Sequence, residues 1–152
     1  MTIDSGNRRE FSTGAVRDID ETKGRCDLLP LGVVADLLGI NTDVLSDLDR
    51  AVHGRDVIMS TQSALISFIK HRGWNMDQAI FEASIRYKEG AEKYEPRNWE
   101  KGIPLHSYYD SAIRHYIKYI CGWDDEEHDR AVVWNLMSAL WTYENLPEMR
   151  DL

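Results

Sequence analysis

The chain has 152 residues, a length that suits one domain and excludes two complete hydrophobic cores. Apolar residues make up 43% and charged residues 29%, which is typical of a folded chain rather than a disordered one. The formal net charge of −8 argues against binding to the backbone of DNA or RNA, which needs clustered lysine and arginine. It does not exclude a single nucleotide, for which a few local cations or a bound metal suffice.

Location can be inferred from what the sequence lacks. There is no run of about 18 apolar residues, and residues 1–10 have no apolar core like that of a signal peptide. The two cysteines, Cys26 and Cys121, provide neither a disulfide framework nor a zinc motif. We therefore expect a cytoplasmic protein with reduced thiols and no membrane contact.

The sequence predicts two parts, a non-helical N-terminal arm over 1–30 and a single helical catalytic domain over 31–152. Residues 4–27 are rich in Gly, Ser, Thr and charge, and they show neither helical nor strand periodicity. From Leu31 onward, apolar residues recur at helical spacing. The predicted fold class is all-α, a helical bundle with an arm.

Two helices are expected in the first part of this domain. A short one over 31–38 ends at Gly39, whereas residues 41–54 are polar and ambiguous, with room for one more helical turn. Ser60 resembles an N-cap for a helix over 61–71.

Longer helices are expected in the rest of the chain. Asn75 can cap a helix over 76–94, and a loop over 97–104 separates it from a helix over 105–121. The last helix is expected to begin at Asp124 and to end near residue 145, because acidic residues favour a helix N-terminus.

This last helix has a narrow polar stripe on an otherwise apolar surface. At about 100° per residue, one sector of roughly 100° contains Asp124, Glu127, His128, Ala131, Asn135, Ser138 and Thr142. Nearly every other position after Ala131 is apolar, so we expect the helix to be buried on most sides. The stripe either faces solvent or lines a polar site, and the two carboxylates and the histidine at its start favour a site.

Two pairs of carboxylates with equal spacing predict a site for a divalent cation. Glu89 and Glu92 lie one turn apart on the helix over 76–94, and Asp124 and Glu127 begin the polar stripe. Acidic pairs on facing helices can gather the oxygen ligands that Mg²⁺ prefers. We predict these four residues as ligands of Mg²⁺, or of Mn²⁺, with Glu92 or Glu127 as the general base.

The loop over 97–104 combines three side chains that suit a nucleotide. Arg97 can contact phosphate, Asn98 can read a base edge, and Trp99 can stack on the base. The alternative is a rim loop in which the tryptophan fills the core.

Further candidates for substrate binding come from the arm and the last two helices. Basic residues of the arm, among them Arg17, can close over a polyphosphate, with Lys23 and Arg25 as the candidates for the triphosphate, unless the arm is an ordinary polar tail. The remaining candidates are Arg114 for phosphate, His115 for phosphate or as an outer partner of a metal carboxylate, His128 on the polar stripe, and Asn135 for the base edge.

Several ordered blocks of the sequence resemble one known family. They are Phe11–Asp18, Lys23–Pro30, Glu89–Tyr94, Arg97–Gly102, Asp110–His115, and His128 with Ala131 and the pair Trp134-Asn135. These blocks resemble the phage dATP/dGTP diphosphohydrolase family, which is similar to the MazG-like all-α nucleoside triphosphate pyrophosphatases.

The resemblance implies a phage-encoded enzyme that acts in the host cytoplasm on dGTP or dATP and releases the monophosphate and pyrophosphate. It also implies Mg²⁺ held by E-x-x-E on one helix and E-x-x-D on the next, and Glu89 and Glu92 match the first pair. For the second pair, Glu126 and Asp129 match literally, whereas the pair Asp124 and Glu127 lies on the polar stripe and is preferred on geometry.

Two other functions are compatible with the sequence. The same pocket can sequester a nucleotide without hydrolysing it, or the aromatic residues can serve a helical interaction protein. A face of small residues at Ala79, Ala83 and Gly90 further suggests a homo-oligomer, either a dimer or a tetramer.

Overall fold

The computed structural model describes residues 4–18, 22–41 and 43–152, so residues 19–21 of the predicted arm lie outside the described residues. The elements in chain order are β1 (Arg8–Glu10), β2 (Val16–Asp18), η1 (Cys26–Leu28), α1 (Leu31–Leu38), α2 (Asp43–Val52), α3 (Val57–Arg72), α4 (Met76–Lys93), η2 (Asn98–Lys101), α5 (Leu105–Ile120), α6 (His128–Asn145) and η3 (Pro147–Met149). The predicted all-α bundle with a short arm is confirmed.

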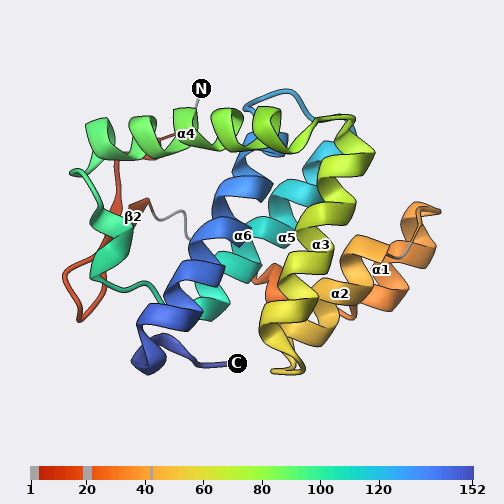
Figure 1. The fold of residues 1–152 in the computed structure, drawn as a ribbon, viewed down its shortest axis with the longest axis horizontal. Helices are drawn as coiled ribbons and strands as arrows, with labels where there is room; N and C mark the ends of the chain where they lie inside the picture. Colours follow the sequence, from red (N-terminus) through yellow and green to blue (C-terminus); the bar gives the residue numbers. More distant parts are fainter. Residues whose placement is uncertain (1–3, 19–21, 42) are drawn as a thin grey trace.

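Packing of α5 against α6 forms the centre of the bundle (Figure 1). Helix α3 lies beside α6, α2 packs on α3, and α4 crosses one end of the bundle where it contacts α6. Large side chains fill the space between these helices, including the fully buried Phe68, Tyr108, Tyr116 and Leu136. None of the described helices is both long and apolar enough to cross a lipid bilayer.

The boundaries of α4 and α5 follow the predictions to within one residue. Asn75 is the N-cap of α4, and its backbone N–H donates to Oε1 of Gln78 at 2.8 Å. Helix α5 begins at Leu105 as expected and ends at Ile120, just before the turn at Gly122.

The sequence left residues 41–54 ambiguous, with room for one more helical turn, whereas helix α2 extends over ten residues there. Its apolar residues Val44, Leu45, Leu48 and Ala51 are all buried, so packing on α3 stabilises a segment that is otherwise polar.

Two helix starts were predicted wrongly. Helix α3 begins at Val57, and the Oγ of Ser60 donates to the carbonyl of Arg55 at 3.1 Å within its first turn rather than capping a later start. Helix α6 begins at His128, so Asp124 and Asp125 belong to the preceding loop.

The arm forms a small antiparallel hairpin that the sequence did not predict, with Arg9 of β1 opposite Arg17 of β2. The small residues Ala79 and Ala83 of α4 are buried inside the chain. This part of the small-residue face therefore needs no second subunit, and the homo-oligomer stays a prediction.

Candidate active site

The polar stripe on α6 is buried from His128 onward, which excludes the solvent-facing alternative for this part of the helix. His128, Ala131, Asn135, Ser138 and Thr142 are each at most 2% exposed. Buried polar side chains need partners, and Ser138 finds one in the hydroxyl of Tyr87 on α4 at 2.7 Å. Burial also raises the pKa of Tyr87 to about 12, so this hydroxyl stays protonated.

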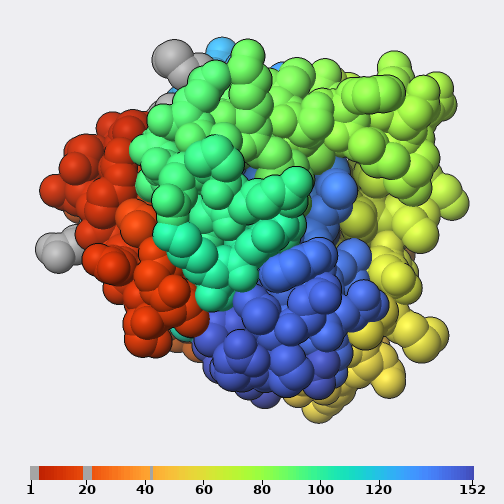
Figure 2. Space-filling model, turned by 60° about the vertical axis from the view of Figure 1, so that its left-hand side comes forward, coloured from red at the N-terminus to blue at the C-terminus, as the bar shows by residue number. Residues whose placement is uncertain are grey.

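The arm lies against the C-terminal part of α4 and the loop that follows it (Figure 2). Phe11 and Ala15 are buried there. The side-chain amide of Asn98 holds β2 by accepting from the Val16 N–H at 2.8 Å and donating to the Val16 carbonyl at 2.7 Å. The arm is thus packed on the helical body rather than a loose tail.

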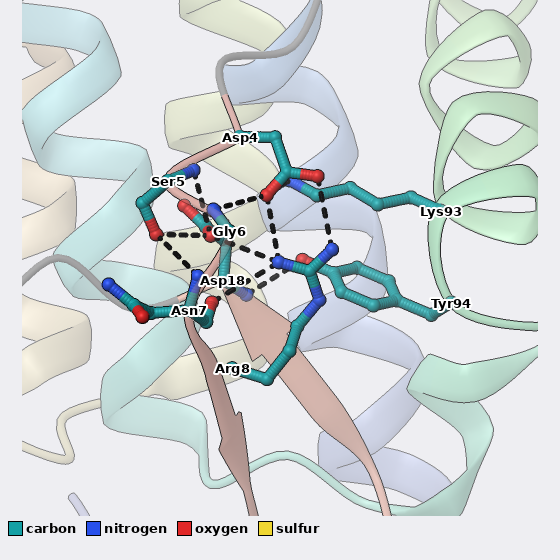
Figure 3. A network of polar contacts seen from close by, with 8 residues as sticks. All are labelled: Asp4, Ser5, Gly6, Asn7, Arg8, Asp18, Lys93 and Tyr94. Atoms are coloured by element: carbon teal, nitrogen blue, oxygen red, sulfur yellow. Dashed lines mark hydrogen bonds and ion pairs between the residues drawn. The ribbon is translucent and has the colours of Figure 1, made fainter.

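A polar network ties the start of the arm to the end of α4 (Figure 3). Asp4 accepts from the guanidinium of Arg8 and lies 3.8 Å from Nζ of Lys93. The backbone N–H of Asp18 donates to the hydroxyl of Tyr94 at 2.7 Å. These contacts place β2 beside α4, and the side chain that precedes Asp18 on this strand lies inside the molecule.

That side chain belongs to Arg17, whose guanidinium is enclosed between the arm and α5 and α6. Its Nη2 donates to Oγ of Ser111 at 3.2 Å and to Oδ1 of Asn135 at 3.3 Å. Its carbon Cζ lies 5.5 Å from the ring centre of Tyr108 and 5.7 Å from that of Trp134.

The second terminal nitrogen of Arg17, Nη1, is buried and has no hydrogen-bond partner among the described residues. Burial lowers the pKa of Arg17, yet an arginine remains charged at neutral pH. A buried cation without an anionic partner is costly. Arg17 is therefore suited to receive an anion.

Arg17 lies on the wall of a cavity of about 500 Å³ with an excess of positive charge. Its basic side chains are Arg9, Arg17, Lys23, Arg25, Arg86, Lys93, Arg114 and Lys118, against four carboxylates from Asp18, Asp110, Asp125 and Glu126. We call this cavity the basic pocket. In a chain with net charge −8, such a local excess of cations indicates a site for a polyanion.

Four residues predicted to bind phosphate line the basic pocket: Lys23, Arg25, Arg114 and His115. Two of them are also held in place by the arm. Arg25 forms a salt bridge with Asp27 at 2.7 Å, and Nη2 of Arg114 donates to the Gly24 carbonyl and to Asp110, both at 2.6 Å.

A smaller cavity of about 80 Å³ adjoins the basic pocket and shares Arg17, Arg86, Lys93 and Tyr94 with it. Its wall contains the aromatic rings of Tyr87, Tyr94, Trp99 and Trp134, and we call it the aromatic pocket. Flat apolar walls beside a cationic cavity can hold a base next to its phosphates.

The predicted residues of the 97–104 loop line the aromatic pocket. Trp99 packs edge-on against Trp141, with ring centres 4.9 Å apart, so it fills the core as well as facing the pocket. Arg97 is exposed and donates to Glu100 at 2.8 Å. Both polar atoms of the Asn98 side chain bind Val16, so its structural partner is the arm rather than a base edge.

The structure does not bring the four predicted metal-binding carboxylates together. Glu89 lies 3.6 Å from a guanidinium nitrogen of Arg130, and the side chain of Glu92 is 68% exposed. Asp124 and Glu127 are exposed residues that precede α6. These four carboxylates form no ligand set for Mg²⁺ in this arrangement, and their role stays a prediction.

Another group of potential metal ligands does lie together. Within the described part of the chain, His115, Glu126 and His128 place one ligand atom each within 4.8 Å of one another. Glu126 also forms a salt bridge with Arg86 at 3.3 Å.

Arg86 was not among the candidates from the sequence, Arg17 was considered only as one of the basic residues of the arm, and Glu126 only as the alternative to the preferred carboxylates. Two signals were present, because Arg17 lies in a block that resembles the family, and Glu126 is the literal match to the E-x-x-D pattern. The other half of that match, Asp129, forms a salt bridge with Arg72 at 2.6 Å instead.

No curated protein and no solved structure matches the chain. Residues 60–152 match the family described as dATP/dGTP diphosphohydrolase, N-terminal. The matched region includes all of α4, α5 and α6, which contribute Arg86, His115 and Asn135 to the features above. Since the match covers more than half of the sequence, the chain belongs to the dATP/dGTP diphosphohydrolase family.

Proposed function

We propose that this protein hydrolyses a purine deoxynucleoside triphosphate, dGTP or dATP, to the monophosphate and pyrophosphate. The observation that carries the proposal is the buried guanidinium of Arg17, whose Nη1 has no partner among the described residues and which lines the basic pocket. Family membership supplies the reaction class and the purine substrate.

In this proposal the triphosphate lies in the basic pocket and provides an acceptor for Nη1 of Arg17, which has no partner within the described parts of the chain. Guanidinium and phosphate groups form short, charge-assisted hydrogen bonds, which are about twice as strong as neutral ones. Ser111 and Asn135 hold one side of the guanidinium, so the other is oriented before the nucleotide arrives. Such preorganisation reduces the entropy lost on binding.

The nucleoside end then faces the aromatic pocket, where Tyr87 and Trp134 form part of the wall. Arg17 lines both cavities and thereby marks the junction between base and phosphates. A purine covers more aromatic surface than a pyrimidine, which agrees with a preference for dGTP or dATP.

The reaction is proposed to need a divalent cation, for which the sequence predicts Mg²⁺. Such an ion neutralises charge on the phosphates and lowers the pKa of an attacking water. The sequence predicts Glu92 or Glu127 as the general base. The proposal keeps Glu127 for this role, because it adjoins Glu126 on the wall of the basic pocket, whereas Glu92 lines neither cavity.

The proposal is tested by incubating the tag-free protein with dGTP or dATP and with Mg²⁺ or Mn²⁺ and by separating the products. We expect the monophosphate and pyrophosphate in equal amounts. Release of inorganic phosphate or of triphosphate would contradict the proposed bond cleavage.

The same samples distinguish the two alternative functions. A protein that only sequesters nucleotides returns intact dGTP after denaturation, although the nucleotide raises its melting temperature. A helical interaction protein shows neither turnover nor stabilisation by any nucleotide.

A further inference from the structure

Two histidines face each other at one side of the basic pocket, in an arrangement that phosphate binding does not require. Nδ1 of His115 on α5 lies 2.9 Å from Nδ1 of His128, the first residue of α6. Their rings are 9% and 2% exposed. Glu126 completes the group, with ligand atoms that all lie within 4.8 Å of one another.

A carboxylate orients one of the two rings. Nε2 of His128 lies 2.6 Å from Oδ1 of Asp125, so the proton of neutral His128 belongs on Nε2. The lone pair of its Nδ1 then points at His115. Histidines that bind metals usually donate their second ring N–H to a carboxylate in this way.

We propose that His115, His128 and Glu126 bind one first-row transition-metal cation, such as Zn²⁺, Co²⁺ or Mn²⁺, and that Asp125 positions His128 for it. The role of this ion in hydrolysis rests on the proposed function, whereas its binding does not.

The spacing of the nitrogens suits such an ion. Two nitrogens bound to one cation at about 2.1 Å lie about 3.0–3.4 Å apart at angles near 90–110°. The separation of 2.9 Å in the structure therefore needs to open by only a few tenths of an ångström. In the structure the two nitrogens are within hydrogen-bond distance of each other.

The ligand types select the ion. Two imidazoles and one carboxylate suit Zn²⁺, Mn²⁺, Co²⁺ and related ions, whereas Mg²⁺ prefers oxygen ligands and retains several waters. The site therefore differs in kind from the all-carboxylate cage predicted from the sequence.

The surroundings of the ligands suit a bound metal. His115 and His128 are both buried beside the basic pocket, so the protein rather than bulk water surrounds the site. The salt bridge from Arg86 to Glu126 uses Oε1, and a carboxylate can accept arginine on one oxygen and coordinate a metal through the other.

The test uses tag-free, chelator-treated protein titrated with Co²⁺ and followed by visible absorption. We expect one Co²⁺ per chain, with ligand-field bands that an equal amount of Zn²⁺ abolishes and a hundredfold excess of Mg²⁺ does not. Absence of Co²⁺ binding, or displacement by equimolar Mg²⁺, would overturn the proposal.

Variants locate the ion. Loss of an outer carboxylate costs about 10- to 100-fold in metal affinity, so Asp125→Asn should weaken Co²⁺ binding by that factor and His128→Gln by at least as much. Glu126→Gln should weaken it as well. His106→Gln, on another α5 histidine paired with an aspartate, and Glu82→Gln, in another glutamate–arginine pair, are matched controls that should bind Co²⁺ like the parent.

If a variant fails to fold, a measurement on the unaltered chain still tests the site. Nitrogen NMR of the imidazoles resolves the five histidines, and Zn²⁺ should shift the Nδ1 signals of His115 and His128 alone. Shifts confined to His53, His71 or His106 would overturn the site. Metal binding without dGTP turnover would refute the proposed function alone, and turnover without metal at these histidines would refute the site alone.

Discussion

The guanidinium of Arg17 donates a hydrogen bond to Oδ1 of Asn135 at 3.3 Å, joining residues that lie 118 positions apart. Nδ2 of Asn135 donates to the Ala131 carbonyl one turn earlier in α6, at 2.8 Å. This second bond fixes the amide so that its oxygen faces Arg17. The polar stripe on α6 therefore orients a cation that the arm supplies.

Replacing Arg17 tests whether this cation binds the nucleotide. A hydrogen bond to a charged group contributes about 1.5–3 kcal/mol, so Arg17→Met should raise the KM for dGTP about 10- to 150-fold. The variant also loses a buried charge that has no anionic partner among the described residues, so its free energy of unfolding should stay within about 2 kcal/mol of the parent. Steady-state kinetics and chemical denaturation measure the two effects.

Arg150→Met is the matched control, because Arg150 also lies over an aromatic ring, that of Tyr143, and donates to a backbone carbonyl. It lines neither cavity and should leave KM unchanged. An Arg17→Met enzyme with the KM of the parent would remove Arg17 from the site.

Asn135→Leu should weaken nucleotide binding because Arg17 loses a partner, and not because Asn135 contacts the base. Loss of the acceptor leaves Nη2 of Arg17 with Ser111 alone, at a cost of about 1–3 kcal/mol, or roughly 5- to 150-fold in binding. A double-mutant cycle with Arg17→Met measures the coupling. We expect Asn135→Leu to have little further effect once Arg17 is gone, and fully additive effects would show that Asn135 contacts the nucleotide itself.

Much of the helical framework was predictable because its signals are local. Asn75 and Gly122 mark ends of α4 and α5, and both act within a few residues. Helix α2 was underestimated because its polar residues obscured four apolar positions that pack on α3. Ser60 was mistaken for a cap because an N-cap is defined by backbone conformation, which composition alone does not determine.

The burial of the polar stripe was predictable from α6 itself, because apolar residues surround it. Its partner was not, because Arg17 reaches Asn135 only after a hairpin forms and Asn98 binds Val16 across 82 positions. Contacts of this length depend on packing of the whole chain rather than on residue spacing. The predicted carboxylates are not in the group of potential ligands that the structure brings within 4.8 Å of one another, since equal spacing on two helices does not fix which faces oppose each other.

Asn98→Ala should loosen the arm while leaving the helices folded. The two hydrogen bonds from this side chain to Val16 contribute about 1 kcal/mol each, and their loss leaves backbone groups of β2 without partners. We expect faster amide hydrogen exchange over residues 8–18 and a higher KM for dGTP, since Arg17 loses its support. Asn145→Ala, which removes an exposed bond to the Trp141 carbonyl, is the control, and unchanged exchange in Asn98→Ala would contradict the anchoring role.

The two cysteines report on the arm without any substitution. Burial raises the pKa of the Cys26 thiol, whereas Cys121 is exposed. Because only the thiolate reacts, iodoacetamide at pH 8 should modify Cys121 well before Cys26, as peptide mass spectrometry can measure. Asn98→Ala should speed the modification of Cys26, and equal rates for both cysteines in the parent would show that the arm is not docked.

Replacing Glu126 or Glu92 by glutamine decides between the two proposed sets of metal ligands. Glu126 is 9% exposed at the side chain and lies with His115 and His128, whereas Glu92 is 68% exposed and has Lys88 at 3.9 Å. Removal of one metal ligand from a catalytic centre should lower kcat by at least about 100-fold, since loss of an outer-shell partner alone costs about 10- to 100-fold. We expect that loss in Glu126→Gln and a kcat within a few-fold of the parent in Glu92→Gln, with dGTP turnover measured at saturating Mn²⁺. The opposite pattern would move the metal to the carboxylate pairs predicted from the sequence, and equal losses would mean that ligands from α4 and from the start of α6 share one metal centre.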